Sequence, residues 1–346
     1  MIQELIELNS DQRREMVNTR QRFQAWRDAE NRQRGLRGSM VWEQSKSREY
    51  LMRSAYDGVG RRKQKSLGPR SPETEGLKAE FDRLRQESRE RIKNLEQVMR
   101  RQAAINKAVG LGRMPLLGAK IVRGLDKIGL LGHGIRVLGT NALYAYEAAA
   151  GVHIEAALTT TEDIDLLFDS RFRLDVLAME DTEEPSLIHI LQKADRSFHR
   201  TDQTFRAMNK DGYLVDLIKP LRNPPWTSDA DRISDDPADL TAVEIEGLSW
   251  HESAPSFEAM AVDERGEPLR IITSDPRVFA AHKFWLSHRV DREPIKKRRD
   301  LAQAKLVARI VATYLPHLPY EREDLRMLPS EVFNDAVPLF EASRSD

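Results

Sequence analysis

Apolar side chains recur at spacings of three and four over residues 1–34 and again over residues 71–109. Positions three and four apart share one side of an α-helix, so both segments are predicted to be amphipathic helices. Ser71 and Pro72 suit the start of the second helix, because serine caps a helix and proline fits its first turn. The apolar stripes predict that the two helices pack on each other or form the contact of a homodimer.

Residues 36–70, between these helices, alternate short apolar runs with turns. The runs at 40–42 and 50–52 have strand character, and a glycine-rich turn follows them. We expect a small antiparallel meander with one basic strand. The candidate nucleic-acid-binding residues of this strand are Arg61, Arg62, Lys63 and Lys65. Cations next to aromatic residues suit a nucleic acid, but a strand edge protected by solvated lysines has the same pattern.

From residue 115 onward, helical and strand-like patterns alternate. Helices are predicted at residues 116–131, 142–150 and 186–194, and strands at residues 135–138, 163–168 and 172–178. Two hairpins are predicted, with arms at 204–209 and 213–219 and at 257–262 and 269–272. Prolines begin two further helices that end near residues 288 and 314.

The predicted fold class is α+β, a mixed sheet with helices, preceded by a helical and small-β region and followed by a helical domain. We expect a basic N-terminal region at 1–115, a core domain at 116–225, and a C-terminal hairpin and helical domain at 226–346.

Charge is distributed unevenly along the chain. Residues 1–130 hold 29 Lys+Arg and 17 Asp+Glu, whereas the remainder holds 26 and 38. A basic N-terminal part suits an anionic partner such as RNA, or docking onto the acidic remainder. The chain has no cysteine, which excludes disulfides and thiol catalysis. It shows no signal-peptide pattern and no long uncharged apolar segment, so we expect a cytoplasmic protein with no membrane partner.

Asp163 and Asp165 lie one residue apart in a predicted strand, so their side chains are expected on the same face. Adjacent carboxylates repel each other, and Mg²⁺ bound together with phosphate oxygens relieves this repulsion. Solvated aspartates on an exposed strand would show the same pattern. Upstream, Gly139, Thr140 and Asn141 offer a backbone free of side chain, a hydroxyl and a helix start, which suit a triphosphate.

The stretches Gly-Thr-Asn-Ala-Leu (139–143) and Thr-Glu-Asp-Ile-Asp-Leu (161–166) together resemble the nucleotidyltransferase superfamily that includes DNA polymerase β. They look most similar to its branch of abortive-infection toxins. Two features depart from the pattern. Thr140 stands where a second glycine or a serine is usual, and 22 residues separate Thr140 from Asp163. The resemblance covers roughly residues 135–305.

The resemblance implies a third acidic residue on a neighbouring strand, which completes the metal site and acts as the base toward the acceptor hydroxyl. Asp216 is the expected residue, because an uncompensated carboxylate among apolar neighbours is costly. Asp211 and Asp175 are alternatives. Two Mg²⁺ ions are implied, with Mn²⁺ able to substitute.

The resemblance also implies that Lys283 contacts the triphosphate, supported by Arg299 and Asp300. The run 296–298 fits solvated charges, and Lys283 also fits a structural role among aromatic residues.

The expected activity is therefore nucleotidyl transfer (EC 2.7.7-type), from an NTP to an acceptor hydroxyl. RNA of a tRNA-like kind is the favoured acceptor, and a cognate antitoxin is an implied partner. Transfer to a protein, to a small molecule, or a catalytically silent nucleotide-binding interaction protein are the alternatives. The chain lacks a phosphate-binding P-loop, a Gly-x-Ser-x-Gly motif and histidines at metal-binding spacing.

Overall fold

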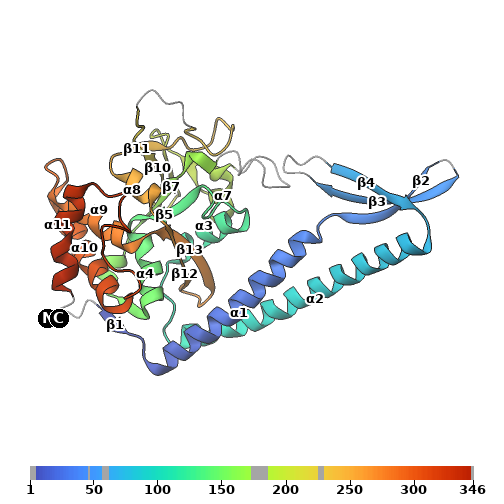
Figure 1. Cartoon of the computed structure of the whole chain (residues 1–346), viewed down its shortest axis with the longest axis horizontal. Helices are drawn as coiled ribbons and strands as arrows, with labels where there is room; N and C mark the ends of the chain where they lie inside the picture. Colours follow the sequence, from blue (N-terminus) through green and yellow to red (C-terminus); the bar gives the residue numbers. More distant parts are fainter. Residues whose placement is uncertain (1–4, 46, 57–61, 173–185, 225–229, 344–346) are drawn as a thin grey trace.

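The computed structural model describes residues 5–45, 47–56, 62–172, 186–224 and 230–343. The described chain forms a globular body and a long arm that projects from it (Figure 1). Helices and strands mix in the body, and the arm combines two helices with a small sheet, so the predicted α+β class is confirmed. No helix of the described chain is long and apolar enough to cross a bilayer.

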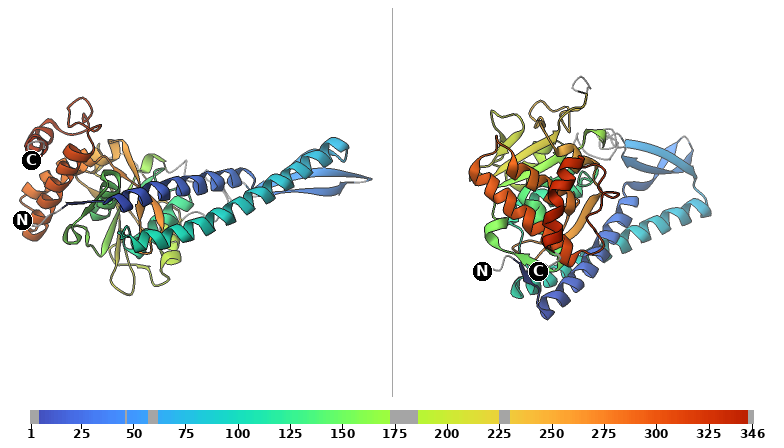
Figure 2. Two further views of the ribbon diagram at one scale, coloured as in Figure 1. Left: turned by 90° about the horizontal axis from the view of Figure 1, so that it is seen from below. Right: turned by 60° about the vertical axis from the view of Figure 1, so that its left-hand side comes forward.

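Two helices that run side by side in opposite directions build the arm, as Figures 1 and 2 show. They are α1 (Ser10–Gly35) and α2 (Pro72–Ala108). Each begins on a capping box, Asn9 with Gln12 and Ser71 with Thr74. The predicted second helix and its serine cap are confirmed.

The prediction of one helix over residues 1–34 is wrong at its start. Leu5–Glu7 forms strand β1, which pairs antiparallel with β6 (Val152–Ile154) of the body. The helix begins only at Ser10, because the side chain of Asn9 accepts a hydrogen bond from the backbone of Gln12 and caps it there. The N-terminal apolar residues therefore tie the arm to the body.

A buried polar network fixes the base of the arm. The amide oxygen of Asn106 accepts from the Thr19 hydroxyl at 2.9 Å and from the Gln102 amide at 2.9 Å. Its amide nitrogen donates to the carbonyl of Gly266 in the body at 2.9 Å. A β-carbon at Gly266 would lie 2.0 Å from the carbonyl oxygen of Ala103, so the body backbone touches α2 directly.

The far end of the arm carries a three-stranded antiparallel sheet, which confirms the predicted meander. Its strands, in spatial order, are β2 (Ser39–Ser45), β3 (Arg48–Tyr56) and β4 (Arg62–Pro69). The predicted turn before the basic strand lies outside the described residues. Leu51 is fully buried beneath this sheet.

Among the described residues, the main sheet of the body has six strands. Five follow the order β5 (Ile135–Leu138), β7 (Asp163–Phe168), β10 (Leu214–Pro220), β9 (Arg206–Met208) and β8 (His199–Arg200). The sixth, β11 (Val243–Ile245), pairs with the second half of β10. The predictions of β5, β7 and the β9–β10 hairpin are confirmed, whereas β8 and β11 are too short to give an alternating pattern.

Helices cover the two faces of this sheet differently. On one face, α3 (Leu116–Lys127) and α7 (Leu187–Ala194) bury Ile164, Leu166 and Val215 in the largest core. On the other face, Leu138, Leu167 and Ile218 pack on α8 (Leu248–Ser253). The predicted helix 116–131 ends early because Gly129 takes a positive φ. The strand predicted at 172–178 lies almost wholly outside the described residues.

A second core joins the C-terminal helices to the body. Its helices are α4 (Leu143–Ala150), α9 (Pro276–His288), α10 (Pro294–Tyr314) and α11 (Ser330–Ala342). The predicted hairpin β12 (Ser256–Val262) and β13 (Pro268–Ser274) packs between the two cores. Helix α11 was not predicted, because Pro338 inside it gives the signal of a helix end. Short helical segments complete the body: η1 (Gly139–Ala142), α5 (Ala156–Thr159) and η2 (Ser170–Phe172).

Candidate active site

Three aspartates lie on one face of the main sheet. Strands β7 and β10 are parallel neighbours, and their register pairs Asp165 with Asp216 and Asp163 with Leu214. Directly paired residues of adjacent strands point to the same face, and Asp163 shares that face because it lies two residues before Asp165. The structure therefore brings Asp216 next to the two aspartates of β7, on the face opposite the largest core.

The surroundings of Asp165 disfavour its charged form. Burial, and then the charge of Asp163, raises the pKa of Asp165 from 3.8 to about 6, and Asp216 adds to the rise. Lys283 and Arg292 act in the opposite direction. A carboxylate held in its charged form here needs a cation beside it.

Gly139 lies directly beside this carboxylate. It directly follows β5, whose last residue, Leu138, pairs with Asp165. Its φ of +61° lies in the left-handed region, and a β-carbon there would lie 2.1 Å from Oδ2 of Asp165. No other residue type fits this position without moving the carboxylate.

Thr140 and Asn141 follow in the 3₁₀ turn η1 and are both buried. The Thr140 hydroxyl accepts hydrogen bonds from Nη2 of Arg299 at 3.0 Å and Nε2 of Gln303 at 3.3 Å. The amide of Asn141 donates to the backbone carbonyl of Asp163 at 2.7 Å. Asn141 thus ties the glycine turn to β7, and Arg299 reaches the same turn from α10.

Asp300 is a buried anchor rather than an exposed ligand. Its carboxylate accepts from Nζ of Lys283 at 2.7 Å and from Nε of Arg292 at 2.8 Å. The Asp300 side chain is 3% exposed, whereas those of Lys283 and Arg292 are 13% and 31% exposed. Asp300 therefore orients two cations whose charges reach Asp165.

Asp216 is held by a partner that the sequence did not predict. Arg206 of β9 is its register neighbour and donates to both carboxylate oxygens, at 2.7 and 2.6 Å. This fork geometry is the strongest form of an arginine–carboxylate pair. Alternation in the predicted hairpin could have indicated Arg206, because it lies directly opposite Asp216.

The donor set suits a hard divalent cation, but the aspartates do not converge on a single point. Across the described residues, no three acidic or histidine side chains are arranged to hold a metal ion. One oxygen of Asp163 accepts from the Thr161 hydroxyl, and Asp216 faces Arg206. To act as a ligand together with Asp163 and Asp165, Asp216 must share its carboxylate with Arg206 or release it.

The other predicted residues lie elsewhere. Asp211 is in the β9–β10 turn, where its backbone NH donates to the Asn209 side chain. Asp175 and Arg61 lie outside the described residues, as does the side chain of Arg62. Lys63 and Lys65 are exposed on β4, at the far end of the arm from the sheet that carries the aspartates (Figure 1).

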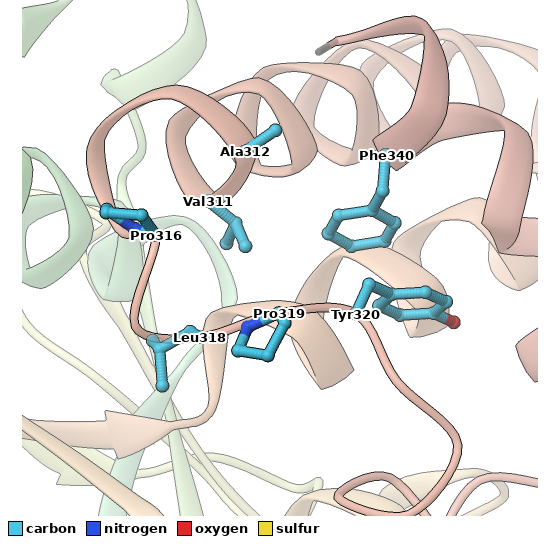
Figure 3. A pocket seen from close by; sticks show the side chains of 7 residues that line it. All are labelled: Val311, Ala312, Pro316, Leu318, Pro319, Tyr320 and Phe340. Carbon is cyan, nitrogen blue, oxygen red and sulfur yellow. The ribbon is translucent and has the colours of Figure 1, made fainter.

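Two hollows differ in size and place. One of about 20 Å³ lies between apolar side chains of α10, α11 and the loop joining them (Figure 3); it has room for a water molecule but not for a nucleotide. The other, about 540 Å³, opens between the start of β9 and β11 and is lined by Phe205, Arg222 and Val243. Phe205 is the neighbour of Arg206, and its carbonyl accepts from the backbone of Leu217 at 2.9 Å. The guanidinium of Arg206 lies 5.3 Å from the centre of the Phe205 ring, so this larger hollow lies near Arg206.

Comparison with known proteins identifies one family. A family model described as nucleotidyltransferase matches residues 117–328 of this chain. No curated protein and no solved structure matches the chain.

Proposed function

The chain belongs to this nucleotidyltransferase family, and from that premise we propose that it moves a nucleoside monophosphate from an NTP to a hydroxyl group of RNA, with Mg²⁺ as cofactor. The pairing of Asp216 with Asp165 across β7 and β10 carries the proposal. It gathers three carboxylates from distant parts of the sequence on one face. Aspartates that only face solvent on a strand give no reason for a further aspartate at the paired position of the adjacent strand.

The residues around the aspartates suit a bound triphosphate. Gly139 leaves its backbone free of a side chain beside Asp165. Lys283, Arg292 and Arg299 come from α9, α10 and the loop between them, and they provide positive charge on the same side. Asp163, Asp165 and Asp216 would hold the Mg²⁺, which, when bound, neutralises phosphate charge and lowers the pKa of the attacking hydroxyl.

The proposed step forms one bond and breaks one bond. The acceptor hydroxyl oxygen attacks the α-phosphorus and gives its proton to the Asp216 carboxylate. The bond between the α-phosphorus and its bridging oxygen to the β-phosphate breaks, and pyrophosphate leaves. Arg206, hydrogen-bonded to both oxygens of Asp216, would orient this base. Lys283 and Arg292 would stabilise the negative charge of the departing pyrophosphate.

RNA is the proposed acceptor because the N-terminal part of the chain is basic. The excess of 29 Lys+Arg over 17 Asp+Glu in residues 1–130 precedes a domain that has the opposite imbalance. A toxin role, a cognate antitoxin and Mn²⁺ as a substitute metal are further predictions that rest on the resemblance to the abortive-infection branch.

Incubation with each α-³²P-labelled NTP, Mg²⁺ and total cellular RNA or protein tests the proposal. We expect label in RNA with wild-type protein and none with the double substitution Asp163→Ala and Asp165→Ala. Glu162→Ala is the matched control, because Glu162 is exposed and directly precedes the two aspartates. Label in protein bands would favour a protein acceptor. Full transfer by the double variant would refute the assignment of these aspartates.

A further inference from the structure

The arm lies outside the part of the chain that defines the family, because both of its helices end before residue 117. Its base is fixed to the body by the buried network around Asn106, and its other end extends away from the body (Figures 1 and 2). A rigid extension that adds no residue to the active-site face is suited to contact with another molecule.

Cations line one flank of α2, here called the basic edge. They recur at intervals of seven or four residues, which return to nearly the same side of a helix. These residues are Lys78, Arg85, Arg89, Lys93, Arg100 and Lys107. The buried side of α2 contains Phe81, Ile92 and Ala103, with Phe81 beneath Arg53 of β3, and the opposite flank exposes Leu77, Leu84 and Ile105. The basic edge is therefore one flank of a half-buried helix.

Most cations of the basic edge have no acidic partner in the part of the chain that the structure describes. Lys78 pairs with Asp82 and Arg100 with Glu96 along the helix. Arg85, Arg89, Lys93 and Lys107 form no ion pair within the described chain. Arg89 and Lys93 are both exposed and lie one helical turn apart. Their charges are therefore available to an anion.

A cluster of like charges extends the basic edge onto the three-stranded sheet β2–β3–β4 at the far end of the arm. The guanidinium of Arg53 in β3 lies 4.3 Å from the centre of the Phe81 ring, and Lys65 is its cross-strand partner. Burial and the nearby charge of Arg85 lower the pKa of Arg53. Nη1 of Arg53 is buried, and no described residue forms a hydrogen bond with it. Like charges placed opposite each other destabilise a sheet, so an anion beside Arg53, Arg85 and Lys65 would relieve a cost already present.

We propose that the basic edge and the cluster of Arg53, Arg85 and Lys65 bind the phosphate backbone of the acceptor RNA. The identity of the RNA as acceptor rests on the proposed function, whereas the contact itself does not. From Lys78 to Lys107 the edge extends about 44 Å at 1.5 Å per residue. This length exceeds one turn of a nucleic-acid duplex, about 34 Å.

A membrane surface fits this helix poorly. A helix that lies on a membrane buries its apolar face among lipids, between flanks that carry the cations. In α2 the apolar residues next to the basic edge are buried, and the exposed Leu77, Leu84 and Ile105 lie on the opposite flank. A regularly spaced polyanion needs only the flank, which is the part that α2 leaves exposed.

Binding of a fluorescein-labelled RNA hairpin to the full-length protein, without NTP or Mg²⁺, tests this contact. The variant Arg89→Gln with Lys93→Gln removes two charges from the basic edge. The variant Arg91→Gln with Arg101→Gln removes two exposed charges from the other side of the same helix, and neither forms an ion pair among the residues that the structure describes. We expect the first to bind roughly tenfold more weakly and to reduce the slope of log K against log salt by about 1.5, while the second stays close to wild type.

Equal weakening of RNA binding by both variants would overturn the inference, because binding would then depend on the net charge of the protein and not on the basic edge. Competition by polyglutamate as strong as that by unlabelled RNA, at equal charge concentration, would also overturn it in favour of an acidic protein. Failure of the proposed function is distinguishable: the RNA-binding difference would persist while no labelled nucleotide enters RNA. Transfer of nucleotide to RNA, with no difference in RNA binding between the two variants, would instead refute only the proposed contact of the arm with RNA.

Discussion

The aspartate face of the body and the basic edge of the arm carry opposite charge and compensate it differently. Around the aspartates, Arg206 pairs with Asp216 in a fork, and Lys283 and Arg292 converge on Asp300. On the basic edge, Arg89 and Lys93 form no ion pair within the described chain. The charges proposed to act in catalysis are held in position by partners, whereas charges proposed to bind RNA phosphates need only be exposed. Removing a charge near the aspartates should therefore change the free energy of unfolding, whereas removing a charge from the basic edge should not.

Gly139→Ala should have the largest effect of the substitutions that remove no charge. The new β-carbon would lie 2.1 Å from the Asp165 carboxylate, and the alanine would have to keep a positive φ. We expect a loss of about 1–3 kcal/mol in the free energy of unfolding and a large loss of transfer. Urea unfolding and the labelled-NTP assay measure the two effects. Gly151→Ala is a matched control for φ, which is +66° there with no atom within 4 Å of the new β-carbon. A stability loss as large at Gly151 would show that φ alone, and not the contact with Asp165, is responsible.

Asp165→Asn should stabilise the metal-free protein above pH 6. The pKa of Asp165 rises from 3.8 in the unfolded chain to about 6, so the folded state binds its proton more tightly. The carboxylate therefore destabilises the fold fully above pH 6 and no longer does so below pH 3.8. We expect a gain of about 3 kcal/mol at pH 8 that disappears near pH 4. Thermal unfolding in EDTA across this range measures it. A gain independent of pH would contradict the assigned cause.

Arg206→Gln should destabilise the protein and strengthen its binding of divalent cations. The substitution leaves the Asp216 carboxylate, 13% exposed, without its fork of donors. We expect a loss of about 1–2 kcal/mol without metal. The freed carboxylate should bind Mn²⁺ more tightly, as measured by its paramagnetic resonance signal. Arg206→Lys keeps the charge but not the two-pronged hydrogen bonding, so its stability and Mn²⁺ affinity should lie between those of wild type and Arg206→Gln. Unchanged Mn²⁺ affinity in Arg206→Gln would show that Asp216 does not face the metal.

Neutralising Arg89 and Lys93 should have the smallest effect on folding. Neither side chain forms an ion pair in the described chain, so no partner is lost. We expect the free energy of unfolding to change by less than about 0.5 kcal/mol, even where RNA binding falls. A larger change would show that the arm charges are coupled to the fold as the body charges are.

The sequence predicted those parts of the site that depend on local pattern. Alternation placed Asp163 and Asp165 on one face of a strand, and an acid in an apolar strand indicated Asp216. The residues that were missed act through tertiary pairing. Arg206 depends on the register of a hairpin, Arg292 lies in a loop, and Gln303 reaches Thr140 from α10.

The predictions of the fold failed where local signals were weak or misleading. Strands β1, β8 and β11 are two or three residues long and form only because a partner strand is present. The apolar residues of β1 continue the helical spacing of α1, so the spacing alone predicted a helix. The basic strand was predicted, but the approach of Arg53, on its neighbour β3, to Arg85 on α2 depends on the folded arm.

The most direct test of the central claim compares transfer by Asp216→Asn and Asp211→Asn. In the proposed mechanism Asp216 acts with Asp163 and Asp165, whereas Asp211 only stabilises the β9–β10 turn. With labelled NTP, Mg²⁺ and RNA, we expect Asp216→Asn to lose on the order of 10³-fold in rate and Asp211→Asn to keep most of its activity. Full activity in Asp216→Asn, or loss of activity only in Asp211→Asn, would contradict the account.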